Sequence, residues 1–551
     1  MVSDSTSDDT GLDIRAAVEE RLREEEQALA EKDGGNGDAP RLTAVKIRQC
    51  LNANELGDGM LYALLNRGRF CYVKSADRWL IWRGHHWEWD TMEERYHGVE
   101  AVCEVYLKES LALRDLITKA FDQDKKDEAN QLKALQKEYL QRVRRLRSGA
   151  GATNCITYAH RIEDPLAIKG EELDKNPWLM ACSNGVVDLR TGRLRDGRPE
   201  DWMVKHVPHE WRGINTPCPL WEGFLNASLD GDCMTSDEER NQHRQQVTDF
   251  LRRALGYGIT GLSTEHFFLV FNGQGRNGKG ILVETIRYVS GSLAGPIPAE
   301  MLLDQGRAAN PNTPSPHIMA LKGMRLAFAS ETDEGRRFSP GQVKWYSGGD
   351  TLKGRDLHAK DFVDFEPTHL LILLTNNLPH APGDDFAFWQ RLTLIPFLYS
   401  FVASPDPQKR NQKQRDEHLR ERLKSEASGI LAWLVRGCLE WQRDGLSPPP
   451  MVTSATEEYR LGEDTISQFV GDCCDMEMDA RENATDIYNV FKRWYRVAIS
   501  AKPGSCPAQK KFGAMLRKQY KAEKVGGVTR YFGLKLKENV NQLYSEESPG
   551  R

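Results

Sequence analysis

One glycine-rich segment has the residue types and the spacing to bind the phosphates of a nucleotide. The strand-like apolar run 266–271 leads into Asn272-Gly-Gln-Gly-Arg-Asn-Gly-Lys-Gly280, and a helix-like run, 281–289, follows. Glycines permit turns with positive φ, so that successive N–H groups and the N-terminus of the helix can bind phosphate oxygens, while Lys279 pairs with the β- and γ-phosphates. The sequence therefore predicts a P-loop whose nucleotide-binding residues are Gly273, Gln274, Gly275, Arg276, Asn277, Gly278, Lys279, Gly280 and Ile281.

Position 280 departs from the usual P-loop pattern. Ser or Thr normally stands there and offers a hydroxyl group to Mg²⁺, whereas this chain has glycine. A glycine-rich turn between a strand and a helix, with no ligand, is therefore the alternative interpretation of the loop.

Two later strands each end at a side chain that could act on the same nucleotide. Apolar residues 324–330 precede Glu331, which we predict to polarise the attacking water or to hold the water shell of a metal ion. Apolar residues 369–375 precede Asn376, whose amide could orient a water molecule near the γ-phosphate. Because ligands bind at the carboxyl ends of parallel strands, Lys279, Glu331 and Asn376 are expected to meet at one edge of a sheet.

The hydrophobic pattern indicates the elements that must position these residues. From about 261 to 401, apolar strands alternate with helices, which indicates an α/β domain, predicted to span 261–445. Helices are expected to dominate residues 220–257, and a charged helix is expected at 408–443. Ser447 and the three prolines 448–450 form a predicted linker.

The segment before the α/β domain has a mixed pattern. Tryptophans at positions 79, 82, 87 and 89 alternate as in strands and are expected to pack in a core. Residues 105–147 have the period of one or two exposed helices or of a helical hairpin, and Asn184-Gly185 with its apolar flanks indicates a β-hairpin. The sequence therefore predicts an α+β domain here.

The C-terminal hundred residues are basic. Residues 486–535 contain 12 Lys or Arg and only two acidic residues, which indicates a polyanionic partner. The pattern predicts an amphipathic helix at 486–499, a second helix at 508–520 and a β-hairpin at 526–534. This order suggests a winged helix whose second helix faces DNA. The predicted DNA-binding residues of this module are Lys510, Lys511, Arg517, Lys518 and Arg530.

Composition limits the class of protein. Hydrophobic residues make up 39% and charged residues 28% of the 551 residues, as in ordinary globular proteins. No apolar run approaches the roughly 18 residues of a membrane span, and the N-terminus lacks the pattern of a signal peptide, so we expect a cytoplasmic protein without a membrane partner.

The 11 cysteines include no Cys-x-x-Cys and are expected to be reduced thiols. Residues 1–40 contain 4 basic and 12 acidic side chains and are predicted to form a disordered tail.

Five motifs, in order along the chain, resemble those of the superfamily 3 helicases. They are Gly-x-Gly-x-Asn-Gly-Lys at 273–279, Ser330-Glu331, Ser347-Gly348-Gly349-Asp350, Thr375-Asn376-Asn377-x-Pro379, and the stretch from Asp385 to Arg391. These motifs lie within about Phe267 to Phe397. More narrowly, the chain is similar to the helicase part of phage and plasmid primase-helicases, relatives of the poxvirus nucleoside triphosphatase, and this similarity extends over residues 42–535.

This resemblance implies an AAA+-like ring, usually a hexamer, in which ATP and Mg²⁺ bind between subunits. Arg391 would be an arginine finger that acts on the nucleotide of the neighbouring subunit, although an isolated arginine in this setting would suggest a surface salt bridge. Asn376 would be the sensor, and Glu331 would be the residue associated with the metal. The family also has a hairpin that grips single-stranded DNA, and its basic residues here would be Lys353, Arg355, His358 and Lys360.

The sequence thus predicts a multidomain α/β protein. Its predicted parts are an acidic tail (1–40), an α+β N-terminal domain of the primase-helicase type (41–215), a helical collar (216–260), an AAA+-like P-loop ATPase (261–445), a winged helix (451–537) and a tail (538–551). The predicted function is an ATP-dependent helicase in DNA replication of the phage, prophage or plasmid type, which acts as a homohexamer on single-stranded and forked DNA. We expect neither an Asp-x-Asp nor a zinc-knuckle pattern to coordinate catalytic metals in the first 210 residues, and therefore predict a stand-alone helicase served by a separate primase or polymerase. The alternatives are a non-enzymatic DNA-binding replication initiator and another P-loop DNA motor, such as a packaging ATPase.

Overall fold

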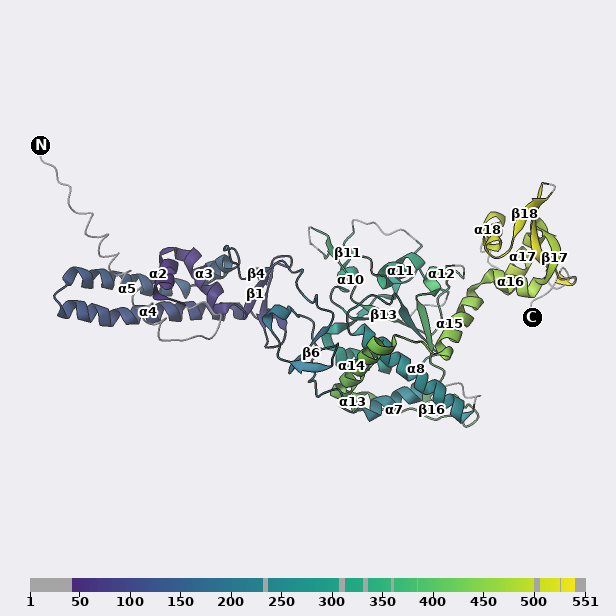
Figure 1. Ribbon diagram of the computed structural model, residues 1–551, viewed down its shortest axis with the longest axis horizontal. Helices are drawn as coiled ribbons and strands as arrows, with labels where there is room; N and C mark the ends of the chain where they lie inside the picture. The colour runs from purple at the N-terminus through teal and green to yellow at the C-terminus, as the bar shows by residue number, and fades with distance from the viewer. Residues whose placement is uncertain are drawn as a thin grey trace. The chain divides into compact units, whose positions relative to one another are not determined.

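The chain divides into two compact units (Figure 1). The computed structural model describes residues 42–230, 236–306, 313–330, 335–357, 361–383, 385–499, 506–525 and 527–540. One unit contains Met1–Asn176, Asn184–Val186 and Arg195–Val204, and the other contains Pro177–Ser183, Val187–Leu194 and Lys205–Arg551. Three predicted site residues, Glu331, His358 and Lys360, lie outside the described residues, as does the predicted acidic tail.

The first unit combines a small sheet with two layers of helix. Its sheet has the order β3-β2-β1-β4, and the strands are β1 (Phe70–Val73), β2 (Arg78–Trp82), β3 (Trp87–Trp89) and β4 (Ala167–Ile168). The helices are α2 (Ala44–Asn52), α3 (Asn54–Asn66), α4 (His97–Asp122), α5 (Lys126–Leu146) and α6 (Gly149–Ala159). The alternating tryptophans lie in or beside β2 and β3, and α4 and α5 form the predicted helical hairpin, so both predictions are confirmed.

A buried ionic network joins the helices of this unit. The carboxylate of Asp58 on α3, which is 2% exposed, accepts a hydrogen bond from Tyr106 of α4 at 3.0 Å and lies 3.3 Å from Nη1 of Arg142 on α5. Burial raises the pKa of Asp58 to about 6, while Arg142 opposes the shift. The helical hairpin is therefore fixed to α3 by charge as well as by apolar packing.

The expectation that the first 210 residues lack an Asp-x-Asp pattern is wrong, because the turn between α4 and α5 carries Asp122-Gln123-Asp124. This spacing is one that primase metal sites use, but both carboxylates are exposed, and Lys126 lies 3.5 Å from Asp124. Among the described residues there is no group of three or more His, Cys, Asp or Glu that could hold a metal ion. The sequence is therefore a surface turn in this structure.

The segment 177–206 contributes a small three-stranded sheet. Its strands β5 (Leu179–Cys182), β6 (Gly185–Asp188) and β7 (Arg193–Arg195) are neighbours in that order. Asn184 and Gly185, the latter with φ 155, lie at the turn between β5 and β6. The predicted β-hairpin is confirmed.

The second unit is built on a five-stranded parallel sheet. The strand order is β14-β8-β13-β10-β9, and every neighbouring pair is parallel. The strands are β8 (Phe268–Asn272), β9 (Ala294–Ile297), β10 (Leu326–Ser330), β13 (Leu370–Thr375) and β14 (Leu392–Pro396). Strands buried on both faces carry continuous apolar runs, which is why β8, β10 and β13 stand out in the sequence.

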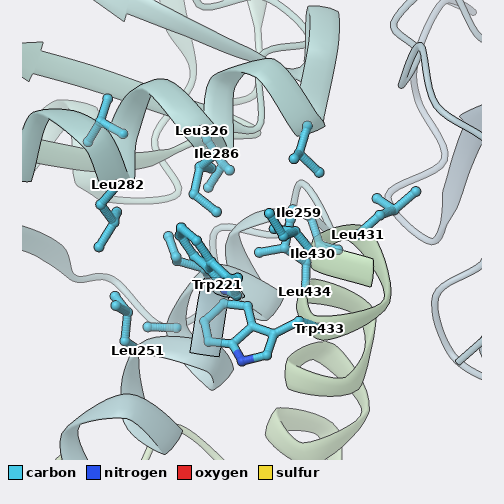
Figure 2. Close-up of a cluster of buried hydrophobic side chains, with 14 of the residues drawn as sticks. Trp221, Leu251, Ile259, Leu282, Ile286, Leu326, Ile430, Leu431, Trp433 and Leu434 are labelled. Carbon is cyan, nitrogen blue, oxygen red and sulfur yellow. The ribbon is translucent and has the colours of Figure 1, made fainter. Parts of the chain in front are cut away.

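Helices cover one face of this sheet. They are α7 (Pro219–Ser228), α8 (Asp237–Gly258), α9 (Lys279–Ser290), α13 (Leu419–Lys424) and α14 (Ala427–Asp444). Figure 2 shows Trp221 and Trp433 within a cluster of leucines and isoleucines from these helices and from β10. The α8 and α14 backbones touch, because a Cβ on Gly256 would overlap the backbone of Gly437 and Cys438. Two facing glycines thus set the spacing of this helix pair.

The prediction of a charged helix at 408–443 is wrong for the first part of this range. Gln412–Gln414 is a strand, β16, which pairs in parallel with β15 (Ser400–Val402), and helix begins only at α13. The strand is held by a tertiary contact that charge patterning cannot reveal, since Nζ of Lys413 lies 2.9 Å from the buried carboxylate of Asp230.

The prolines of the predicted linker begin another helix. Pro450 is the first residue of α15 (Pro450–Glu463), a position that suits proline. This helix packs on the edge strand β14, where Leu394 donates its N–H to Thr456 at 3.0 Å and Tyr459 stacks edge-on against Trp389.

The C-terminal module has its own core. Its elements are α16 (Thr465–Cys473), β17 (Cys474–Asn483), α17 (Ala484–Ala498), α18 (Gln509–Gln519), β18 (Ala522–Val525) and β19 (Val528–Leu536), and its antiparallel sheet has the order β17-β19-β18. The two predicted helices are confirmed as α17 and α18, and the predicted hairpin is present as the β18–β19 pair, although its first strand precedes the predicted range 526–534. The sequence did not predict α16 or β17. Phe469, Phe491 and Phe512 meet in the core.

The remaining short helices are η1 (Glu94–Tyr96), η2 (Pro199–Asp201), η3 (Gly291–Leu293), η4 (Ala299–Met301), α10 (Pro316–Met319), α11 (Pro340–Ser347) and α12 (Phe386–Trp389). Among the helices of the described ranges, none is long and apolar enough to cross a membrane.

Candidate functional site

The glycine-rich loop joins the end of β8 to the start of α9. Gly275 has φ 91 and Gly278, the N-cap of α9, has φ 90, so both occupy the left-handed region that favours glycine. A Cβ on Gly273 would overlap Nδ2 of Asn277, and a Cβ on Gly278 would lie 2.7 Å from Oγ of Ser228. The loop therefore needs glycine at these positions for its shape and for the close approach of neighbouring atoms.

Lys279 is held at the centre of the loop. Its Nζ donates to the carbonyl oxygen of Gly273 at 2.6 Å and to Oδ1 of Asn376 at 3.1 Å. The side chain is 6% exposed, and burial lowers the pKa of its ammonium group to about 8. The fold thus brings together two of the predicted site residues, Lys279 and Asn376, from segments almost a hundred residues apart.

Parallel pairing explains why these side chains meet. Phe271 of β8 pairs with Leu374 of β13, and Leu374 pairs with Ser330 of β10. The carboxyl ends of the three strands therefore lie level at one edge of the sheet. Glu331 follows Ser330 directly in the sequence but lies outside the described residues, so its catalytic and metal-binding roles stay predictions.

Two buried polar groups flank the loop without a hydrogen-bond partner among the described residues. Nδ2 of Asn277 belongs to a side chain that is 3% exposed, and Oγ of Ser228 belongs to one that is 0% exposed. A buried donor left unpaired costs roughly 1–3 kcal/mol, so both groups suit a bound ligand. Ser228, at the end of α7, was not predicted, because only the tertiary fold places it beside the loop.

The loop fits nucleotide phosphates better than it fits a metal ion. Glycines with positive φ at the start of a helix, a lysine and an unpaired amide are groups that bind phosphate oxygens. Gly280 offers no hydroxyl, although a Cβ there would meet nothing within 4 Å. The described residues at this edge provide no carboxylate ligand set for Mg²⁺. Gln274, Arg276 and Ile281 lie on the loop and the first turn of α9, as predicted.

Arg391 lies at the amino ends of the parallel strands, whereas the glycine-rich loop lies at their carboxyl ends. Arg391 precedes β14, in which Leu392 pairs with Phe268 and Pro396 pairs with Asn272. The glycine-rich loop begins one residue beyond Asn272, so Arg391 lies six residues away from its level along β14. At 3.3 Å per residue, this separation is about 20 Å. Within one chain, the fold therefore does not bring Arg391 to Lys279.

The Arg391 side chain has no salt bridge to a carboxylate of the described residues. Its Nη1 donates to the carbonyl oxygen of Ala387 at 2.8 Å, and its Nε is buried with no described partner. Phe386, on the same short helix as Ala387, is 66% exposed. The face around α12 thus combines a guanidinium with an exposed aromatic ring.

The predicted hairpin is present as β11 (Leu352–Gly354) and β12 (Val363–Phe365), which pair antiparallel. We call Lys353 and Arg355 the hairpin cations. Both lie over the ring of Phe362, at 5.8 and 5.3 Å, and Nζ of the exposed Lys353 also lies 3.8 Å from Oδ1 of Asp364 on β12. The hairpin therefore places two cations beside an aromatic ring, and Asp364 offsets part of their charge.

The predicted basic residues of the C-terminal module lie on two elements. Lys510, Lys511 and Arg517 are exposed on α18, and Lys518 belongs to the same helix. Arg530 is half-buried on β19, opposite Asn483 of β17 and Glu523 of β18.

Residues 59–229 match the family model described as D5 N terminal like. "Putative helicase L207/L206" of Acanthamoeba polyphaga mimivirus is 26% identical over 464 residues, which cover 81% of this chain and 46% of the viral protein. "Putative primase C962R" of African swine fever virus is 22% identical over 349 residues, which cover 60% of this chain and 34% of that protein. A solved apo structure of the NrS-1 C-terminal region has a TM-score of 0.35 and 11% identity, over 60% of this chain and 76% of that one.

The chain spans less than half the length of these two viral relatives. The family match covers most of the first unit and the start of the second, whereas the longer viral match extends over most of the chain. The chain is therefore similar to the D5 N-terminal-like family model over residues 59–229 and to viral proteins named putative helicase and putative primase.

Proposed function

We propose that the protein is an ATP-driven DNA helicase of the superfamily 3 type, related to the poxvirus nucleoside triphosphatase, which translocates on single-stranded DNA as a ring during replication. One observation carries the proposal. Lys279, at the start of α9, lies within hydrogen-bond distance of Asn376, which follows the strand β13 beside β8, at the edge where the glycine-rich loop leads into α9. This arrangement suits the binding and hydrolysis of a nucleoside triphosphate. The energy of hydrolysis would drive the movement of the protein along DNA.

Each residue of the site has a distinct role in this proposal. The N–H groups of the loop bind the β- and γ-phosphates, and Lys279 exchanges its contacts with Gly273 and Asn376 for phosphate oxygens. Asn376, released from the lysine, orients the attacking water, and Glu331 accepts its proton. Mg²⁺ would neutralise charge on the phosphates when bound, but Gly280 provides no ligand for it, so no step is assigned to the ion.

Arg391 acts across a subunit interface in this proposal. The distance of about 20 Å along β14 argues against action on the nucleotide of its own chain. A ring, proposed here to be a homohexamer, would bring the guanidinium of one subunit to the γ-phosphate of the next. Exposed Phe386 beside it suits such an interface, because aromatic residues and arginines are enriched there.

Two surfaces would contact DNA. The hairpin cations would grip single-stranded DNA through phosphate contacts that do not depend on sequence. The C-terminal module is proposed to be a winged helix that docks on DNA through α18, since two helices are followed by a hairpin and the module is strongly basic. A separate primase or polymerase would supply the other steps of replication.

The Lys279→Ala variant tests the enzymatic proposal. It should lose ATPase activity stimulated by single-stranded DNA and lose strand unwinding, because no neutral side chain replaces the ammonium group on the phosphates. Lys409→Ala, which removes an exposed lysine of the same unit, is the matched control and should keep both activities. ATP turnover near the wild-type rate in Lys279→Ala would contradict the P-loop assignment, and DNA binding without any turnover in the wild type would favour a non-enzymatic initiator.

A further inference from the structure

The C-terminal module contains a cavity of about 310 Å³ between α18, the start of α17 and β19. Lys510, Gly513 and Arg517 of α18 line it, together with Ala484 of α17 and with Thr529 and Tyr531 of β19. Two cations and no acidic side chain are among its described lining residues. The volume lies near the lower end of the roughly 300–1,000 Å³ found for small-ligand pockets, so the cavity suits a small anionic group.

Helical spacing selects which cations of α18 face the cavity. Lys510, Gly513 and Arg517 are at positions i, i+3 and i+7, which lie on one face of a helix. Lys511 is one position further round the helix and does not line the cavity. Within the described part of the chain, neither Lys510 nor Arg517 forms a salt bridge, so their charges are available to a ligand.

Gly513 makes room inside the cavity. A glycine in the middle of a helix is about 1 kcal/mol less favourable than alanine. Packing does not require glycine here, because a Cβ would meet the Tyr531 hydroxyl at 3.4 Å and Nη2 of Arg517 at 3.7 Å, which are ordinary contacts. The Tyr531 hydroxyl in turn donates to the carbonyl oxygen of Gly513 at 3.1 Å and fixes this wall. The absent methyl group therefore leaves space between the Tyr531 hydroxyl and the Arg517 guanidinium.

We propose that this cavity binds one backbone phosphate of DNA, with Lys510 and Arg517 as its charged ligands and the Thr529 hydroxyl as a further donor. The inference rests on the proposed DNA-binding role of the module and names a specific site within it. Free phosphate shares the same chemistry. A polyanion is favoured because residues 486–535 carry 12 basic and two acidic side chains, far more charge than one small anion needs.

The test measures binding of the full-length chain to a labelled DNA duplex by fluorescence anisotropy, without nucleotide, between 50 and 200 mM salt. Arg517→Gln and Lys510→Gln should each weaken binding by roughly three- to tenfold and reduce the slope of log K against log salt by about 0.9, the value for one lost phosphate contact. Gly513→Ala should weaken binding while its Tm stays equal or rises, because alanine favours the helix but fills the cavity.

Lys524→Gln is the matched control, because it removes the same charge from an exposed position of β18 outside the cavity. It should leave the salt slope unchanged. Losses in Lys511→Gln alone, with the three cavity variants unchanged, would overturn the phosphate site while leaving DNA binding by α18 in place. No loss in any α18 variant would refute both the site and the DNA-binding role of the module.

Equilibrium dialysis with inorganic phosphate distinguishes the two sources of the anion. Tight binding of free phosphate that Arg517→Gln abolishes, without any change in DNA affinity, would identify a free anion as the ligand and overturn the backbone assignment. Weak or absent binding of free phosphate, together with the lowered salt slope, supports it.

Discussion

Nucleotide affinity should depend on pH through Lys279. Burial lowers the pKa of this ammonium group from 10.5 to about 8, a difference equivalent to about 3 kcal/mol at 1.36 kcal/mol per pKa unit. Bound phosphates favour the charged form and should return the pKa to its ordinary range or above. Below pH 8 the lysine is already charged, so binding needs no proton. Above pH 8 binding must take up a proton, and affinity falls until the pKa of the bound state is reached.

The magnitude follows from this difference in pKa. With a pKa of about 8 in the free protein and one near 10.5 or above in the complex, affinity at pH 9 should be about tenfold weaker than at pH 7.5. Isothermal titration calorimetry with a non-hydrolysable ATP analogue, in two buffers of different ionisation enthalpy, would measure both the affinity and the proton uptake.

The control is Lys279→Met, which should bind weakly and lose most of the pH dependence, because it has no group to titrate. The Tm of the free protein, followed over the same range, would exclude unfolding as the cause. Constant affinity of the wild type between pH 7.5 and 9.5, with no proton uptake, would refute the argument that a desolvated lysine receives the phosphates.

Three further predictions concern the interface, the DNA grip and the first unit. Arg391→Ala should lower ATPase by roughly 10³ to 10⁵ in rate, and mixing it with Lys279→Ala protein should restore some activity, because a mixed interface unites an intact loop with an intact guanidinium; mixed rings without any recovery would contradict action in trans. Neutralising both hairpin cations should abolish unwinding but spare DNA binding, whereas deleting the chain after Glu463, so that α15 is kept on β14, should mainly weaken binding in anisotropy assays. Removing Arg142 should destabilise the first unit by about 3–5 kcal/mol, because Asp58 would stay buried without its charged partner and keep only the hydrogen bond from Tyr106, while removing exposed Arg145 should cost less than about 1 kcal/mol in the same thermal unfolding experiment.

Local signals accounted for much of the fold. Apolar runs bounded by glycine or polar residues predicted β8, β10 and β13, because strands buried on both faces need no alternation. The periods of α4, α5, α17 and α18 were equally visible, since each helix buries one face. Charge patterning failed at β16, whose conformation depends on pairing with β15 and on the contact of Lys413 with the distant Asp230.

The sequence by itself determined the candidate nucleotide site at the level of the loop. The glycines, the lysine and the asparagine are encoded in short segments whose conformations depend on their own backbone constraints. Because parallel strands end at a common edge, Lys279 and Asn376 could be expected to meet, and they do, at 3.1 Å.

Only the tertiary structure decided the features that depend on which segments become neighbours. Ser228 lies beside Gly278 because α7 packs against the loop, and no local pattern announces that contact. Arg391 lies at the far edge of the sheet because β14 runs parallel to β8, so its separation from Lys279 is a consequence of strand direction. Lys510 and Lys511 look alike in sequence, yet only Lys510 lines the cavity with Arg517, because one step along a helix turns a side chain by about 100° onto another face.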